Sequence, residues 1–263
     1  MFSGITSAVT VTGPSLSPVS DILQQAYGIA PERPVPLGGG YRNEIWRTDD
    51  VVVRVERAPT ESVAWEHELV NFLAPRVDEV VAPIRAADGA TFVLWQQRVV
   101  SVWPYVDGAP ARRRHEPHAV AAAALLARLH AACREWDGVQ RPGWDATVAG
   151  HPVGPIHGDF YRGNLLVRRG RIVGLLDWEE AHVDSLDYEL ANAVWQFAVS
   201  KREHDFDRRL ARAMIEAYGS DLHPDDLVPL IVARLRYERD VWGAESDETY
   251  QLHLRRSIER LGG

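Results

Sequence analysis

The stretch HGDFYRGNLLVRRGRIVGLLDW, residues 157–178, constrains the fold of this chain more than any other. Its two apolar runs, LLV and RIVGLL, flank the polar sequence RRGR, in which Gly170 holds the natural turn position. This pattern predicts a β-hairpin. The hairpin would return Asp177 to the neighbourhood of Asn164, and Asp159 would lie in the loop that enters the first strand. Buried carboxylates are costly unless they are paired, hydrogen-bonded or bound to metal.

Three oxygen-bearing side chains at one mouth of a hairpin suit Mg²⁺, which is held by one or two protein groups together with substrate phosphates. His157, Asp159 and Asn164 also keep the spacing H-x-D-x-x-x-x-N of the protein-kinase catalytic loop, in which Asp accepts a hydroxyl proton and Asn holds the metal. Here HGD replaces HRD, and DWE replaces DFG. The alternative is a network of turn or cap hydrogen bonds, for which Asp and Asn are also favoured.

HGDFYRGNLLV followed by GLLDWEEA closely resembles the aminoglycoside phosphotransferase and choline kinase-like family of small-molecule kinases. The resemblance continues along most of the chain. LGGGYRNEIWR is similar to the loop that covers the nucleotide, VVVRVER to the strand with the phosphate-binding lysine, and WEHELVNFLA to the helix with its acidic partner. VWPYVDG resembles the hinge, and LLARLHA the helix before the catalytic loop.

The resemblance implies a role for each residue of the predicted hairpin. Asp159 would be the catalytic base or would orient the acceptor hydroxyl. Asn164 and Asp177 would bind Mg²⁺, and His157 would support the loop structurally. The implied reaction is transfer of the γ-phosphate of ATP (or GTP) to a hydroxyl group of a small molecule.

The resemblance also implies where the nucleotide and the acceptor bind. Backbone groups of the hinge would hold the base, although Pro104 lacks an N–H and cannot donate. The expected nucleotide-binding residues are Gly38, Gly39, Gly40, Asn43, Arg54, Glu66, Trp103 and Tyr105. The expected acceptor-binding residues are Glu179, Trp195, Tyr237 and Trp242, of which the aromatic ones are more simply explained as core.

Arg54 stands where the family has its lysine. Arginine keeps a permanent positive charge and can bind phosphate through two donors, but its planar group is larger. Lys201 is the only lysine of the chain, so replacement of lysine by arginine is a general feature of this sequence. An active kinase is the main prediction, and a catalytically silent nucleotide-binding protein is the alternative that Arg54 raises.

The predicted fold is an α+β, bilobal, protein-kinase-like fold with a nucleotide clamped between the lobes. Residues 1–105 are expected to form a β-rich nucleotide-binding lobe, with residues 1–17 as a flexible arm rich in Gly, Ser, Thr and Pro. Within it, residues 18–28 predict a short helix that Gly28 ends. Residues 106–263 are expected to form a mainly helical catalytic and substrate-binding lobe, in which the hairpin is the only obvious pair of strands.

Composition excludes several classes of protein. The net charge of −8 argues against a nucleic-acid partner, which needs a basic face. No apolar run is long enough to span a membrane, and the N-terminal residues lack the pattern of a secretory signal. Cys133 is the only cysteine, which suits a reducing, cytoplasmic compartment. The acceptor stays open: an aminoglycoside or other antibiotic sugar, which would make this a resistance enzyme, or homoserine, choline or a metabolic sugar.

Overall fold

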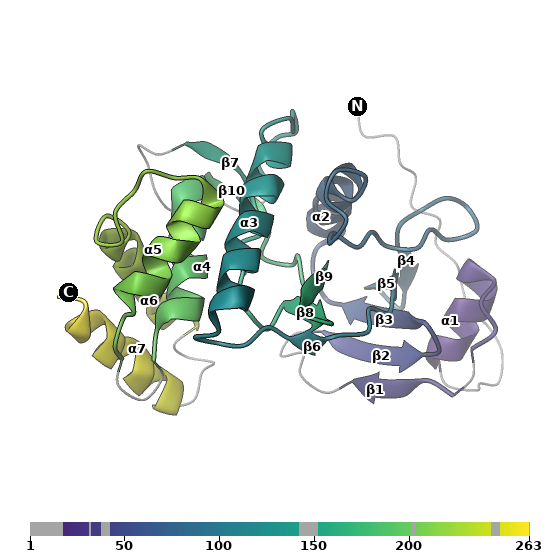
Figure 1. Ribbon diagram of the computed structural model, residues 1–263. Coiled ribbons are helices and arrows are strands. Elements are labelled where there is room, and N and C mark those ends of the chain that lie inside the picture. The colour runs from purple at the N-terminus through teal and green to yellow at the C-terminus, as the bar shows by residue number, and fades with distance from the viewer. Residues whose placement is uncertain are drawn as a thin grey trace. The chain divides into compact units, whose positions relative to one another are not determined.

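The computed structural model describes residues 18–31, 33–37, 43–141, 152–200, 204–242 and 248–262, and the side chains of residues 18, 241 and 242 are outside this description. The chain divides into two compact units, one of residues 1–107 with 141–143 and one of residues 108–140 with 144–263 (Figure 1). The predicted arm of residues 1–17 and the predicted glycine loop, Gly38, Gly39 and Gly40, lie outside the described residues.

The first unit contains an antiparallel sheet in the order β1-β2-β3-β5-β4, accompanied by helices α1 and α2 (Figure 1). Strands β2 and β3 form an antiparallel hairpin that pairs from Glu44↔Val55 to Thr48↔Val51. The elements are α1 (Pro18–Tyr27), β1 (Val35–Leu37), β2 (Glu44–Thr48), β3 (Val51–Glu56), α2 (Thr60–Leu73), β4 (Val93–Trp95) and β5 (Arg98–Pro104).

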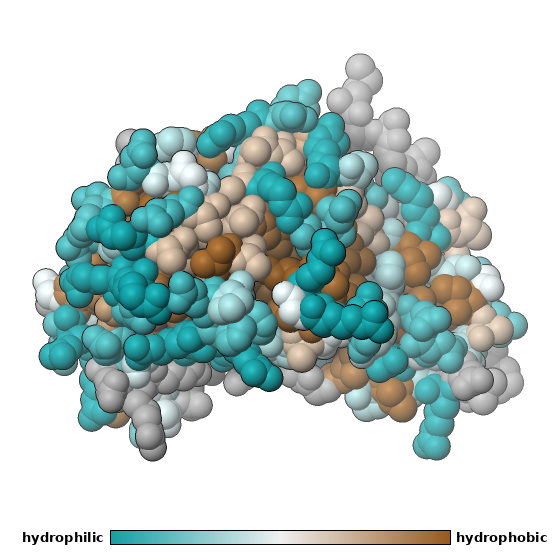
Figure 2. All heavy atoms as spheres, viewed as in Figure 1, coloured by the Kyte–Doolittle hydropathy of each residue, from teal (hydrophilic) through white to brown (hydrophobic). Residues whose placement is uncertain are grey.

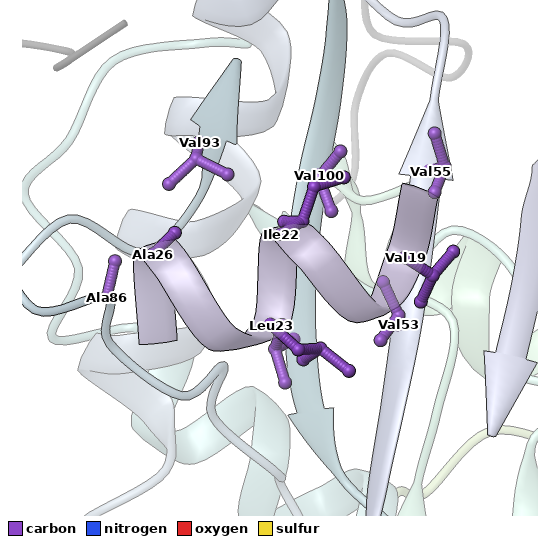
Figure 3. Packing of buried hydrophobic residues seen from close by; sticks show 10 residues of the cluster. Val19, Ile22, Leu23, Ala26, Val53, Val55, Ala86, Val93 and Val100 are labelled. Carbon is purple, nitrogen blue, oxygen red and sulfur yellow. The ribbon is translucent and has the colours of Figure 1, made fainter. Parts of the chain in front are cut away.

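Helix α1 contributes its apolar face to the core of this unit (Figure 3). Val19, Ile22, Leu23 and Ala26 recur at helical spacing and are buried, so they form one stripe of the helix. They pack with strand residues that are also buried, namely Val53, Val55, Val93, Val100 and Val102. The predicted end of the helix at Gly28 is confirmed by a φ of +66° at that residue, a conformation that glycine adopts at little cost.

The second unit combines helices with two small antiparallel sheets. Its elements are β6 (Ala109–Pro110), α3 (Glu116–Cys133), β7 (Val153–Ile156), β8 (Leu165–Arg168), β9 (Arg171–Leu175), β10 (His182–Ser185), α4 (Leu186–Ala198), α5 (Arg208–Tyr218), α6 (Val228–Trp242) and α7 (Glu248–Arg260). The strands pair in the orders β6-β8-β9 and β10-β7.

The sequence predicts only the β8–β9 hairpin in this unit, so β6, β7 and β10 are additions that the structure reveals. Their sequences explain the omission. Strand β7 includes Gly154 and Pro155, which are poor strand formers. Strand β10 buries the polar side chains of His182 and Asp184, so it lacks the alternation that marks a strand in a sequence.

The exposed side of the C-terminal helix is mostly polar, with Tyr250 and Leu252 as its exposed hydrophobic residues. Figure 2 shows hydrophilic side chains over most of the visible surface around α7. Leu254 and Ile258 of that helix are buried, which is the pattern of an amphipathic helix packed on the unit. Among the described residues no helix combines the length and the apolarity needed to cross a membrane.

Candidate active site

The predicted hairpin is confirmed and sets the position of Asn164 relative to Asp177. Strand β8 pairs with β9 from Leu165↔Leu175 to Arg168↔Arg171. The two turn residues, Arg169 and Gly170, have φ of +51° and +76°, as a tight type I′ hairpin turn requires. Just beyond the strands, the N–H of Leu176 donates to the carbonyl of Asn164 at 2.9 Å. Asp177 therefore follows directly on the residue that faces Asn164.

Asn164 is bound to Asp159 through its amide nitrogen. Nδ2 donates to both the backbone carbonyl and Oδ2 of Asp159, each at 3.0 Å. The side chain of Asp159 is 34% exposed, so the carboxylate is open to a ligand on one side. Burial of the rest raises the pKa of Asp159, and Glu238 adds to this effect. The charge of Arg234 and the hydrogen bond from Asn164 offset only part of this increase.

The chemistry of these residues fits Mg²⁺. With its nitrogen donating to Asp159, Asn164 has its amide oxygen left, and that oxygen accepts no hydrogen bond from the described residues. Asp177 is exposed and has a φ of +65°, a strained conformation typical of functional sites. Burial raises the pKa of Tyr161, and the charges of Asp159 and Asp177 act in the same direction.

A complete cage of protein ligands is absent from this part of the chain. No three His, Cys, Asp or Glu side chains of the described residues group as a metal site. Mg²⁺ does not need such a cage, because it keeps waters and binds substrate phosphates alongside one or two protein oxygens. Asn164 and Asp177 match that limited requirement.

His157 contacts the loop and the hairpin through its two ring nitrogens. Nε2 donates to the carbonyl of Leu176 at 2.9 Å, and Nδ1 accepts from the N–H of Asp159 at 3.2 Å. This pattern requires the neutral imidazole with its proton on Nε2. The ring is fully buried and lies 4.5 Å from the ring of Trp178. His157 therefore ties the Asp159 loop to the end of β9.

Gly158 explains why glycine stands in HGD. Its φ is +80°, and a Cβ at this position would lie 2.0 Å from the carbonyl oxygen of Glu180. No other residue fits without displacement of that backbone. Glycine replaces the arginine of HRD because the backbone at Glu180 lies too close to residue 158 for a side chain.

Glu189 of α4 stabilises the Asp159 loop through hydrogen bonds to its backbone, and this residue was not predicted from the sequence. Its carboxylate is fully buried and accepts from the N–H of Gly158 at 2.7 Å and of His157 at 3.0 Å. His130 Nε2 lies 2.9 Å from the same group. Burial raises the pKa of Glu189, but the hydrogen bonds from His130 and from the backbone N–H of His157 lower it by more than burial raises it, so the carboxylate stays ionised. An acid within the apolar helical pattern LDYELANAVW is the signal that could have identified it.

Arg234 of α6 contacts the loop on its other side. Its Nη1 donates to the carbonyl of Gly158 at 3.0 Å, and its Nη2 lies 4.0 Å from Oδ1 of Asp159. Its Nε donates to Glu238 at 2.7 Å, and the hydroxyl of Tyr250 donates to the same carboxylate at 2.5 Å. Helix α6 thus supplies a buried ion pair, Arg234 with Glu238, that reaches Asp159, and Tyr250 of α7 joins it from the exposed side.

The four residues predicted to bind the acceptor differ in how far their side chains are exposed to solvent. Tyr237 is half-buried, and its ring lies 5.8 Å from the guanidinium of Arg234. Trp195 is 3% exposed and its ring packs near that of Phe206. Glu179 is half-buried two residues beyond Asp177. The side chain of Trp242 lies outside the description.

In the first unit, Arg54 and Glu66 form the ion pair expected from the resemblance. Arg54 Nη2 donates to Glu66 Oε1 at 2.6 Å, and both side chains are buried. Arg54 Nε also lies 2.8 Å from the carboxylate of Glu56. The guanidinium lies 5.5 Å from the ring centroid of Trp103. The larger head of arginine therefore has two acidic partners.

The hinge residues show which backbone groups are already bonded. The N–H of Tyr105 donates to the carbonyl of Asp50 at 2.7 Å, so this donor is occupied. The Tyr105 ring lies 3.5 Å from the guanidinium of Arg47. Asn43 stands in a half-buried bend before β2. A base bound at this hinge would rely on backbone groups other than the Tyr105 N–H.

Comparison with known proteins identifies a family and a fold. The model of the phosphotransferase enzyme family matches residues 34–150 and 134–228. A homoserine kinase of Paraburkholderia xenovorans (strain LB400) is 23% identical over 264 residues, covering 82% of this chain and 78% of that protein.

Solved structures share the fold at low identity. Amicoumacin kinase hAmiN, in complex with AMP-PNP, Ca²⁺ and Ami, gives a TM-score of 0.71 at 11% identity and covers 87% of each chain. A microcompartment-associated aminopropanol kinase gives 0.66 at 17% identity, covering 87% of this chain and 89% of that one. The predicted bilobal, protein-kinase-like α+β fold is confirmed.

Proposed function

Because the chain belongs to the phosphotransferase enzyme family and is a small-molecule kinase, we propose that it transfers the γ-phosphate of ATP to a hydroxyl group of a small acceptor. The observation that carries this proposal is the arrangement around Asn164. Its side-chain nitrogen donates to Asp159, its side-chain oxygen accepts no hydrogen bond from the described residues, and its backbone carbonyl accepts from Leu176, the residue before Asp177. A turn network would need neither the strained Asp177 nor a carboxylate left partly open.

In the proposed reaction Asp159 orients the acceptor hydroxyl and accepts its proton. Asn164 and Asp177 would hold Mg²⁺, which would supply charge neutralisation at the transferred phosphate. Arg54 contacts the phosphates of the donor, oriented by Glu66. Phosphoryl transfer requires mainly positioning and charge neutralisation, which explains why so much buried structure supports the short Asp159 loop.

The acceptor is proposed from the relatives. Proteins named homoserine kinase match most of this chain, which makes homoserine the first acceptor to test. Structures of similar fold include an amicoumacin kinase and an aminopropanol kinase, so amino alcohols and antibiotics form the second group. Choline and metabolic sugars complete the panel. We propose a cytoplasmic location on the basis of the single cysteine.

The experiment is a coupled assay of acceptor-dependent ADP release, run with Mg-ATP and Mg-GTP over this panel. Phosphorylated product is identified by mass spectrometry. We expect one acceptor class to stimulate ADP release in the wild-type chain and not in Asp159→Asn. If the wild-type chain binds Mg-ATP but phosphorylates no acceptor, the alternative raised by Arg54, a catalytically silent nucleotide-binding protein, would replace this proposal.

A further inference from the structure

Arg141 is a buried arginine that packs on helix α2, although it is distant from that helix in the sequence. Its side chain is 3% exposed. Nε donates to the hydroxyl of Ser62 at 2.8 Å, and Nη2 lies 3.5 Å from Oε2 of Glu66. The guanidinium lies 5.8 Å from the ring centroid of Trp65. Ser62, Trp65 and Glu66 all belong to α2.

Glu66 therefore lies between two arginines. Oε1 accepts from Arg54 at 2.6 Å, and Oε2 faces Arg141. Oε2 is buried and receives no hydrogen bond of good geometry from the described residues, so the charge of Arg141 is what compensates it. A buried carboxylate that loses such a charge is strongly disfavoured.

Charge balance gives a reason for the second arginine. A lysine has a compact ammonium group, whereas the fork of Arg54 contacts two carboxylates, Glu56 at 2.8 Å and Glu66 at 2.6 Å. One cation with two buried anions would leave one negative charge, whereas the addition of Arg141 brings these four groups to neutrality. His67, next to Glu66, adds no charge near pH 7. Burial lowers the pKa of His67 to about 4, Arg54 and Arg141 act in the same direction, and Glu66 opposes them.

We propose that Arg141 is a positioning residue for nucleotide binding, which acts through Glu66 to keep the guanidinium of Arg54 oriented toward the phosphates. The inference rests on the proposed function of Arg54 as a phosphate-binding group. Without Arg141, Glu56 and Glu66 would share the single positive charge of Arg54. The guanidinium of Arg54 would then be held by these two acids, and the remaining negative charge would repel a negatively charged ligand. Arg54, which stands where the family has its lysine, would therefore depend on Arg141, a residue outside helix α2, to bind phosphate.

The experiment measures binding of Mg-ADP and of adenosine by calorimetry to the full-length chain. Arg141→Met removes the charge, and Arg141→Lys retains it. Arg208→Met is the matched control, because Arg208 is 59% exposed and pairs with an exposed Asp225. Glu66→Gln, alone and combined with Arg141→Met, completes a double-mutant cycle. Thermal unfolding verifies that each variant is folded.

We expect Arg141→Met to weaken Mg-ADP binding about tenfold and to leave adenosine binding within about twofold. Arg141→Lys should recover most of the affinity, and the Arg208 control should behave as wild type. In the Glu66→Gln background, Arg141→Met should have no further effect. A merely structural role would weaken both ligands alike and would persist in that background.

Several results would overturn the inference. Wild-type affinity for Mg-ADP in folded Arg141→Met would do so with the proposed function intact, and so would an equal loss for adenosine. If Arg141→Met does not fold, the double variant decides: affinity more than about threefold below that of Glu66→Gln alone would contradict us. No binding of Mg-ADP by the wild-type chain would overturn the proposed function itself.

Discussion

Glu189→Gln replaces one carboxylate oxygen with an amide NH₂ group at the side chain that accepts two backbone hydrogen bonds from the Asp159 loop. In the wild-type chain Oε1 accepts from the N–H of Gly158 at 2.7 Å, and Oε2 accepts from the N–H of His157 at 3.0 Å. Whichever way the glutamine amide is turned, its NH₂ group faces one of these N–H groups. One backbone donor of the loop therefore loses its acceptor in a site that water does not reach.

The magnitude follows from the kind of hydrogen bond that is lost. A hydrogen bond to a charged group contributes about 1.5 to 3 kcal/mol, so we expect the free energy of unfolding to fall by about 2 to 3 kcal/mol. Displacement of the loop by a fraction of an ångström should also lower kcat by roughly 10- to 100-fold. The acceptor KM should change less, because the residues that bind the acceptor are not replaced.

The effect should depend on pH with a defined sign. The pKa of Glu189 is lowered in the folded chain, so its carboxylate stabilises the fold at pH values above the pKa of an unfolded glutamate, about 4.3. That stabilisation is lost as the pH falls below this value. The difference in stability between wild type and Glu189→Gln should therefore be full at pH 7 and shrink below about pH 4.

Thermal and urea unfolding, monitored by fluorescence, measure the loss, and the coupled ADP assay measures kcat. The matched control is Glu116→Gln, because Glu116 is 46% exposed and pairs with an exposed Arg209; such a pair contributes less than about 1 kcal/mol. A fall in Tm below about 1 °C for Glu189→Gln, or equal losses in variant and control, would refute our account of the loop.

Three further predictions concern the same loop. Gly158→Ala should destabilise the chain by about 2 kcal/mol or more, measured by urea unfolding, because its Cβ would meet the Glu180 carbonyl at 2.0 Å; a wild-type midpoint would contradict the described backbone. Asp159→Asn should lower kcat by roughly 10²- to 10⁴-fold in the ADP assay with little change in Tm, and rates within a few-fold of wild type would remove Asp159 from catalysis. Arg234→Met should destabilise the chain by about 3 kcal/mol or more, because it leaves the carboxylate of Glu238 without its buried partner at 2.7 Å; an unchanged unfolding curve would show that this pair contributes nothing.

The local features of the site followed from the sequence. The hairpin, its turn at Gly170 and the approach of Asp177 to Asn164 depend on apolar runs and on residues close together in the chain. Period-two patterns and turn residues act over short distances, so they can be recognised without knowledge of the fold. The pairing of Arg54 with Glu66 was expected only through the resemblance to a kinase family, and the structure shows the contact.

The supporting residues could not be found in the same way. Glu189, Arg234 and Arg141 reach their partners from segments far along the chain. A helical pattern shows which face of a helix is buried, but not which loop that face meets.

The sequence by itself determined the set of reactive groups and their order along one hairpin, because these residues lie within one short segment of the chain. What only the tertiary structure decided was which buried charges compensate one another. That depends on distances between segments that the chain brings together only when it folds.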